Sequence, residues 1–221
     1  MSNYIPPNYD IWECENFFYL KSHPSRINKF IAHYELYKKI TKLSGCIIEC
    51  GVFKGASLIR WAHFRNFLEK NQSRNIYGFD TFGAFPIKGI KSNKDQKFIK
   101  KYKAERGGVG IDEKTLKKFI RDKKITNVHL FKGNVLHTVN QFIKKKKNLK
   151  IALLHLDLDV YEPTLYTLKV FSKYVVKGGV ILIDDYNLID GATRATNDFL
   201  KNKSLKVQKI SNHLTQVYIK I

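Results

Sequence analysis

Four aspartates lie directly behind two short apolar runs in the second half of this 221-residue chain. They are Asp157, Asp159, Asp184 and Asp185. Carboxylates gathered this closely repel one another, and they can stay ionised together only if a positive charge lies among them. A divalent cation that prefers hard oxygen ligands, such as Mg²⁺, fits best. Any single Asp is more often a loop cap, but the set of four favours a functional site.

The elements that must position these acids form a strand–helix–strand unit. The apolar runs, residues 151–156 and 180–183, have the length and the Ile, Leu and Val content of strands buried on both faces. Pro163 predicts the start of a helix between them, and Gly178-Gly179 predicts its end. Strands joined in this way are parallel and share a carboxyl edge, which is where open α/β sheets bind ligands. In an extended chain, Asp157 and Asp159 would point the same way.

An earlier segment, GCIIECGVFKGAS at residues 45–57, reads as a strand, a glycine turn and the start of a helix reaching about residue 70. Gly51 would let the backbone approach a ligand closely, and the helix N-terminus would offer free N–H donors. The spacing differs from the dinucleotide pattern G-x-G-x-x-G, and such turns also occur in purely structural roles. Asp80 ends a second strand at 75–79, where a doubly wound fold can hold ribose hydroxyls.

The remaining periodicity predicts one domain over residues 1–221, without a linker or an internal repeat. It has an α/β fold with a doubly wound, mostly parallel seven-stranded sheet and helices on both faces. The N-terminal extension, residues 1–43, has an irregular part at 1–22, whose aromatic side chains are expected to pack on the domain. Ser25 is expected to cap the first helix. The other expected helices are at 26–43, 113–123, 138–146 and 191–201, and the other strands at 128–131, 205–210 and 216–221.

A polar, Lys-rich segment at residues 87–112 interrupts the alternation of strands and helices. Long segments of this kind are usually lids or disordered. We expect a mobile lid over the acid cluster, spanning residues 83–112.

Composition limits the partners. Lys and Arg number 40 against 19 Asp and Glu, a formal charge of +21 that favours anionic partners such as nucleic acid, a membrane surface or phosphorylated small molecules. Excess Lys at exposed positions explains the charge equally well, and no nucleic-acid motif is present, so no specific nucleic acid is expected.

No apolar run approaches the roughly 20 residues of a membrane span. Three cysteines without a CxxC pair, and an N-terminus unlike a signal peptide, predict a cytoplasmic location.

The motifs together resemble the macrocin O-methyltransferase family, whose members are metal-dependent and use S-adenosylmethionine to methylate sugar hydroxyls. The resemblance runs from about residue 43 to the C-terminus. It is carried by IECGVFKGAS, YGFDTFGAFP, KGNVLHTV, LDLDVYEPT, KGGVILIDDY and GATRATNDFL. It is most specific at the DLD, GG and DDY segments.

The resemblance implies roles for individual residues. The glycine motif around the methionine part of the cofactor contains Glu49, Gly51 and Gly55; Asp80 would hold the ribose, and Gly133 with Asn134 would border the adenine. The metal ligands would be Asp157, Asp184 and Asp185. Asp159 matches the general base of one branch of the family. Other branches use a histidine, and His155 and His213 are the nearby alternatives.

The function implied is Mg²⁺-assisted transfer of a methyl group from S-adenosyl-L-methionine to a sugar hydroxyl of a nucleotide sugar, a glycan or a glycosylated small molecule. The acceptor could be phosphorylated, and the protein could form a homo-oligomer. A catechol-type O-methyltransferase would need the same acids. A basic nucleic-acid-binding methyltransferase, or a binding module without catalysis, would use the positive charge. A nicotinamide dehydrogenase would share the fold but lacks the expected fingerprint.

Overall fold

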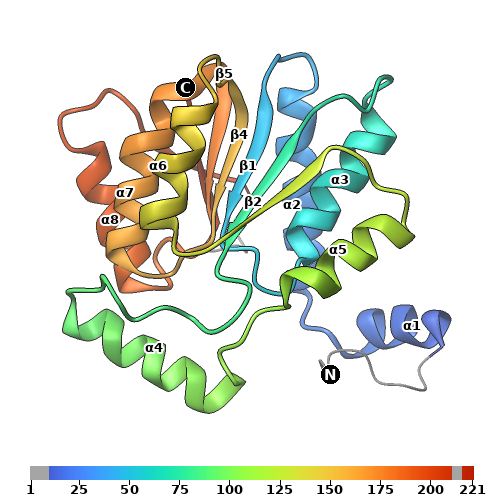
Figure 1. Ribbon diagram of the computed structural model, residues 1–221, viewed down its shortest axis with the longest axis horizontal. Helices are drawn as coiled ribbons and strands as arrows, with labels where there is room; N and C mark the ends of the chain where they lie inside the picture. The colour runs from blue at the N-terminus through green and yellow to red at the C-terminus, as the bar shows by residue number, and fades with distance from the viewer. Residues whose placement is uncertain (1–9, 211–215) are drawn as a thin grey trace.

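A seven-stranded sheet runs through the protein, as seen in a computed structural model that describes residues 10–210 and 216–221 (Figure 1). The strands lie in the order β3-β2-β1-β4-β5-β7-β6. All neighbours from β3 to β5 are parallel, whereas β7 is antiparallel to both β5 and β6. The predicted doubly wound, mostly parallel sheet is therefore confirmed. The strands are β1 (Cys46–Cys50), β2 (Ile76–Asp80), β3 (Val128–Lys132), β4 (Ile151–Leu156), β5 (Val175–Ile183), β6 (Val207–Lys209) and β7 (Val217–Lys220).

Helices cover both faces of this sheet (Figure 1). One face packs against α2, α3 and α5 through residues such as Tyr37, Trp61 and Leu116, and the other against α6, α7 and α8 through Phe142 and Phe171. Successive strand residues alternate between these two cores, as the pleat requires. The helices are α1 (Ile11–Lys21), α2 (Ser25–Ile40), α3 (Ala56–Leu68), α4 (Asn93–Arg106), α5 (Glu113–Asp122), α6 (Val135–Lys145), α7 (Tyr161–Phe171) and α8 (Asp190–Leu200). Among the described residues, no helix has the length and apolar character that a membrane crossing requires.

The strand–helix–strand unit is present, but its internal boundaries differ from those predicted. Helix α7 already begins at Tyr161, and a short 3₁₀ turn, Ser172–Tyr174, follows it. Gly178-Gly179 lies inside β5 and does not end a helix. Gly178 has φ +83°, and a Cβ on Gly179 would come within 3.0 Å of the carbonyl oxygen of Ala152, so the glycines allow an irregular, closely packed strand.

The N-terminal extension is also more regular than predicted. Residues 11–21 form α1 instead of an irregular segment, and none of their side chains is buried, so the expected packing on the domain is wrong for them. The other expected aromatics of this region, Tyr4 and Tyr9, lie outside the described residues. Ser25 is the first residue of α2 rather than its cap, because the N-cap position is Pro24.

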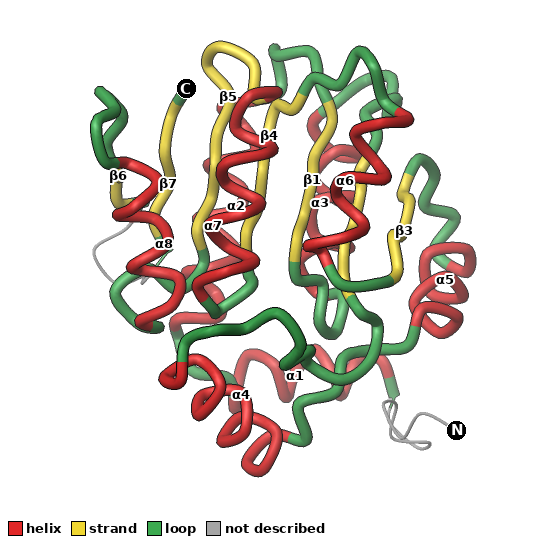
Figure 2. The backbone as a smooth tube through the Cα atoms, turned by 60° about the vertical axis from the view of Figure 1, so that its left-hand side comes forward, coloured by secondary structure: helices red, strands yellow, loops and turns green. Residues whose placement is uncertain are grey.

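The Lys-rich segment contains a helix, α4, which lies beyond the carboxyl edge of the parallel strands (Figures 1 and 2). Ser92 caps α4, and Asp95 near its start accepts a hydrogen bond from Tyr161 N at the start of α7. The two ends of the segment are joined by a bridge between Ala84 and Val109. The predicted lid therefore has a defined helical structure, anchored at both ends.

Candidate active site

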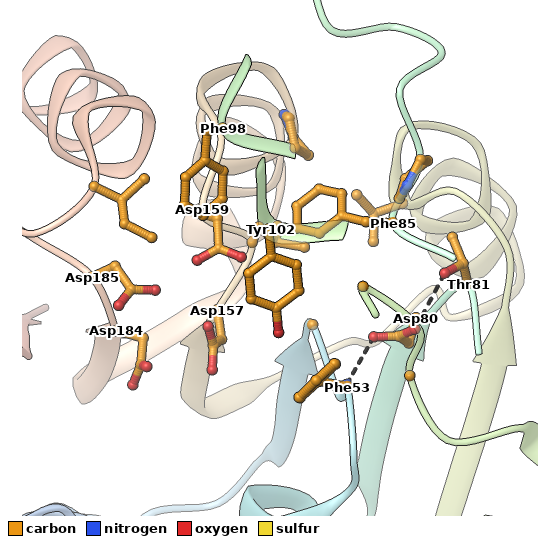
Figure 3. Close-up of a pocket in the computed structure, with 18 of the residues that line it drawn as sticks. Phe53, Asp80, Thr81, Phe85, Phe98, Tyr102, Asp157, Asp159, Asp184 and Asp185 are labelled. Atoms are coloured by element: carbon orange, nitrogen blue, oxygen red, sulfur yellow. Dashed lines mark hydrogen bonds between the residues drawn. The ribbon is translucent and has the colours of Figure 1, made fainter. Parts of the chain in front are cut away.

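A cavity of about 660 Å³ opens at the carboxyl edge of the parallel strands, beside the point between β1 and β4 where the strand order reverses. Ligands in doubly wound folds bind at such a point. Figure 3 shows the four aspartates on one side of the cavity and Asp80 with Thr81 on the other. The cavity therefore joins the two sets of residues that the sequence singled out.

Gly51 forms the wall between these two sides. Its φ of +91° favours glycine, and a Cβ at this position would collide with the carbonyl oxygen of Asp157. The backbone after β1 can therefore lie directly against the first residue after β4. The close approach of Gly51 to a ligand stays a prediction, and the structure shows its close approach to the backbone of Asp157.

Asp80 holds the glycine turn in place. Its carboxylate accepts hydrogen bonds from the backbone N–H groups of Val52 at 2.8 Å, Phe53 at 2.9 Å and Phe82 at 2.7 Å. The hydroxyl of Thr81 also lies 3.4 Å from Asp80 Oδ1, so each oxygen of this carboxylate, which lines the cavity, already has two donors from the protein. The predicted contact with ribose stays a prediction, and the structure adds a role in shaping the loop.

The other residues predicted to bind the cofactor differ in whether they line the cavity. Gly133 and Asn134 line the cavity, and Asn134 also caps α6 by accepting from Leu136 N at 3.0 Å. Gly55 is the N-cap of α3, with φ +85°, and does not line the cavity. Glu49 is fully buried behind the turn, where its Oε1 accepts a hydrogen bond from Ser57 Oγ at 2.6 Å. Contact of Glu49 with the cofactor therefore stays a prediction.

Three of the aspartates are close enough together to bind one metal ion. Asp157, Asp184 and Asp185 each offer a carboxylate oxygen, and these oxygens lie within 4.8 Å of one another. All three line the cavity, and their oxygens are the hard donors that Mg²⁺ prefers. The donor set therefore fits a divalent cation.

The acids perturb one another strongly. Burial and the charge of Asp184 raise the pKa of Asp157 well above its ordinary value. Burial, with the charges of Asp184 and Asp159, raises the pKa of Asp185 to about 9. Asp184 is the exception: burial would raise its pKa, but the neighbouring His155 and Lys29 outweigh burial and hold it below the ordinary value. Asp184 is therefore held as an anion, and the raised pKa values of Asp157 and Asp185 reflect burial and a mutual repulsion that a bound cation would relieve.

Asp159 lies beside this cluster and faces the cavity. Its φ of +61° is uncommon for a non-glycine residue, so the chain leaves the extended conformation after β4. The expected reason for the shared direction of Asp157 and Asp159, a continuing strand, is therefore wrong, although both line the cavity. Burial and the charge of Asp157 raise the pKa of Asp159 to about 7.

Lys29, on α2, is a site residue that the sequence did not indicate. Its Nζ lies 2.6 Å from Asp184 Oδ2, and the two side chains are 18% and 9% exposed. The amide of Gln216, just before β7, contacts Asp184 Oδ1 and His33 Nε2. Lys29 and His33 are one turn apart on α2, but nothing in that spacing indicates a contact with Asp184, 155 residues after Lys29.

The histidines named as alternative bases have different outcomes. His155 is fully buried and does not line the cavity. Its two ring nitrogens lie 3.6 Å from Glu49 Oε2 and from Asp184 Oδ1, so it stands between the glycine turn and the acid cluster. His213 lies outside the described residues. Of the described candidates, Asp159 is the one that faces the cavity.

Helix α4 supplies aromatic side chains to the cavity, next to Asp157 and Asp159 (Figure 3). Tyr102 and Phe98 of α4 line the cavity, with their ring centroids 6.1 Å apart. Tyr102 also contacts Phe53 of the glycine turn at 6.1 Å and Phe85 at 6.3 Å between ring centroids. Lys101 of the same helix and Arg26 of α2 line the cavity as well. The cavity is thus lined by carboxylates, by aromatic rings and by three cationic side chains, since Lys29 lines it too.

Comparison with known proteins identifies the family of the chain. The family model for macrocin O-methyltransferase (TylF) matches residues 26–220. The chain belongs to the macrocin O-methyltransferase family. It is therefore an O-methyltransferase of the class that uses S-adenosylmethionine, as the resemblance implied. No curated protein sequence matches the chain.

Solved structures of methyltransferases share its fold. The calicheamicin methyltransferase CalS11 has a TM-score of 0.77 at 24% identity, over 96% of this chain and 87% of that one. An apo structure of CalS11, described as a TDP-rhamnose 3′-O-methyltransferase, has a TM-score of 0.72 at 23% identity, over 97% and 87%. The O-methyltransferase NovP has a TM-score of 0.75 at 19% identity, over 88% and 79%. These structures support the fold of a class I methyltransferase from this family.

Proposed function

We propose that this enzyme transfers a methyl group from S-adenosylmethionine to a hydroxyl of a sugar that carries a phosphate or nucleotide group. The observation that carries the proposal is the cavity itself, in which the acid cluster faces the glycine turn across a space large enough for a sugar. The membership of the family supports a sugar acceptor. The acid cluster supports an acceptor whose hydroxyl must be deprotonated.

The cofactor would be held on the side of the cavity formed by Gly51, Asp80, Gly133 and Asn134. S-Adenosylmethionine supplies a methyl group already activated on a sulfonium, so the protein needs no covalent intermediate. Asp80 fixes the turn through Val52 N and Phe53 N and lines the cavity, where a ribose hydroxyl could replace the long contact from Thr81.

Asp157, Asp184 and Asp185 would hold a divalent cation, most simply Mg²⁺. Such an ion would lower the pKa of a sugar hydroxyl, which is otherwise a poor nucleophile. Lys29 and Gln216 fix the carboxylate of Asp184, so that this ligand is held in one orientation before any ion arrives.

Asp159 would accept the proton of the attacking hydroxyl. Its carboxylate faces the cavity, and burial with the charge of Asp157 already favours proton uptake by raising its pKa to about 7. Tyr102 and Phe98 would lie over the apolar face of the sugar and exclude water from the reacting atoms.

A phosphorylated acceptor is favoured by the cations that line the same cavity. Arg26 approaches from the start of α2, and Lys101 approaches from α4. CalS11, which has a similar fold, is described as acting on TDP-rhamnose. A nucleotide sugar is therefore the first acceptor class to test here. We propose the cytoplasm as the location, because Cys14, Cys46 and Cys50 are all free.

The deciding experiment incubates the purified protein with S-adenosylmethionine and panels of nucleotide sugars, unphosphorylated sugars, glycosides and catechols, and detects methylated products by mass spectrometry. Each panel is run with Mg²⁺ and with a chelator. We expect a sugar product that depends on the cation. Products from catechols alone would replace the sugar assignment, and turnover indifferent to the chelator would remove the cation from the mechanism.

A further inference from the structure

Helix α1 is apolar yet uncovered. Trp12 is 70% exposed, Tyr19 60% and Leu20 79%, and no residue of the helix is buried. Figure 1 shows α1 apart from the sheet and from the helices that cover it. Its apolar side chains are distributed around the whole helix. Large apolar side chains gathered in the exposed state are typical of a surface that binds a partner.

The turn after α1 directs it away from its own domain. His23 Nδ1 lies 2.9 Å from Ser25 Oγ and accepts a hydrogen bond from Ser25 N, while His23 O accepts from Arg26 N. Pro24, at the N-cap of α2, removes a donor and fixes φ within the same turn. These contacts would have to break before α1 could fold back onto α2.

A surface that suits α1 lies on the same chain. An apolar groove of about 270 Å³ runs between α2 and α3, lined by Phe30, Ile59, Phe64 and Phe67, with His63 and Arg60 at its border. Phe67 is 76% exposed and Phe30 is 47% exposed. Both side chains lie against cationic or aromatic neighbours of their own domain, namely His63 and Arg60, and still present most or half of their surface to solvent.

We propose that α1 of one copy docks in the α2–α3 groove of a second copy, and that the exchange is reciprocal. A two-fold arrangement uses each helix and each groove once and leaves neither exposed. Charge favours this occupant. The segment 10–21 carries Asp10, Glu13 and Glu15 against a single Lys21, whereas the whole chain has a formal charge of +21.

This acidic character matches the guanidinium of Arg60, which lies over Phe30 in the groove, and reduces the repulsion between two basic chains. It also argues against an anionic membrane surface as the partner of α1, because carboxylates would meet the lipid phosphates. A second copy is the partner that offers apolar surface and positive charge together.

The test uses the native thiol of Cys14, which lies exposed on α1. Burial raises the pKa of Cys46 to about 12 and that of Cys50 well above its ordinary value, so these two thiols stay unreactive. In the full chain, Phe67→Cys places a thiol on the groove at a site too exposed to disturb folding. The control, Lys169→Cys, places an exposed thiol on α7, on the opposite face of the sheet.

On mild oxidation we expect Phe67→Cys to form covalent dimers through Cys14 and position 67, as identified by peptide mass mapping, and Lys169→Cys to form none through position 169. Light scattering should give twice the mass of one chain for the wild type. Trp12→Glu should raise the dimer dissociation constant at least about tenfold, since buried Trp residues dominate interfaces. A disulfide within one chain would show that α1 fills its own groove. A monomer without cross-links would likewise overturn the proposal.

Discussion

Replacing Lys29 by Met tests whether the acid cluster depends on a cation built into the protein. Lys29 Nζ lies 2.6 Å from Asp184 Oδ2, and the two side chains are only 18% and 9% exposed. Removing one partner of a buried ion pair leaves an uncompensated charge and typically costs about 3–5 kcal/mol. Since neither group is completely buried and the neighbouring acids can retain protons, we expect the lower end, about 3 kcal/mol.

The measurement is urea unfolding at neutral pH in the presence of a chelator. In a thermal melt of the same variant, a loss of about 3 kcal/mol would lower Tm by roughly 6–12 °C for a chain of this size. Lys38→Met is the matched control. Lys38 lies on the same helix and contacts Glu35 at 3.0 Å, but both side chains are about half exposed. An exposed pair of this kind contributes at most about 0.5–1 kcal/mol.

The two variants therefore separate a site-specific cation from a surface one. If Lys29→Met unfolds within about 0.5 kcal/mol of Lys38→Met, the buried contact contributes no more than an exposed pair and the reasoning fails. Repeating the titration with Mg²⁺ adds a second comparison. Because a bound cation would supply the charge that Met removes, Mg²⁺ should stabilise Lys29→Met more than it stabilises Lys38→Met.

Three further predictions follow from the site and its surroundings. Asp157→Asn should lower turnover at least about 100-fold, while calorimetry should find binding of S-adenosylhomocysteine little changed; loss of that binding would instead place Asp157 in the cofactor pocket. Tyr102→Ala should raise the KM for the acceptor roughly 3- to 10-fold, equivalent to an aromatic contact of about 0.5–1.5 kcal/mol. An unchanged acceptor KM would remove Tyr102 from recognition. A thiol reagent at pH 8 should titrate Cys14 in the native protein and Cys46 and Cys50 only after unfolding, since burial raises the pKa of both. Fast reaction of either would contradict the packed strand β1.

The convergence of the acids could be predicted because it depends on local rules. Two apolar runs joined by a helix must be parallel, and parallel strands end at one edge, so Asp157 and Asp184 had to approach each other. The same rules could not predict Lys29 or Gln216. These residues reach Asp184 through the packing of α2 against the sheet and through the antiparallel pairing of β7 with β5. Neither contact leaves a periodic signal in the sequence.

Two predictions of irregular structure are wrong for the same reason. Residues 11–21 and the Lys-rich segment read as irregular because neither shows an apolar stripe on one side of a helix. In α1 the apolar residues surround the helix, and in α4 charged residues surround a short apolar face formed by Phe98, Ile99 and Tyr102. Periodicity detects a helix that packs on its own core. It is weak for a helix such as α4, which lines a cavity, and for α1, which has no buried residue.

The region that the family model matches includes α4 but not α1. It begins at residue 26 and ends at residue 220, so it includes α4, Lys29, Gln216 and all four aspartates but excludes α1. The chemistry shared by the family is therefore carried without α1, and the exposed apolar surface of α1 needs another explanation. Two variants test this separation directly. Trp12→Glu should weaken self-association and leave methyl transfer intact, whereas Asp157→Asn should lower methyl transfer and leave self-association intact. If Trp12→Glu also lost turnover without a loss of stability, the partner copy would have to complete the active site, and association and catalysis would be one property of this enzyme.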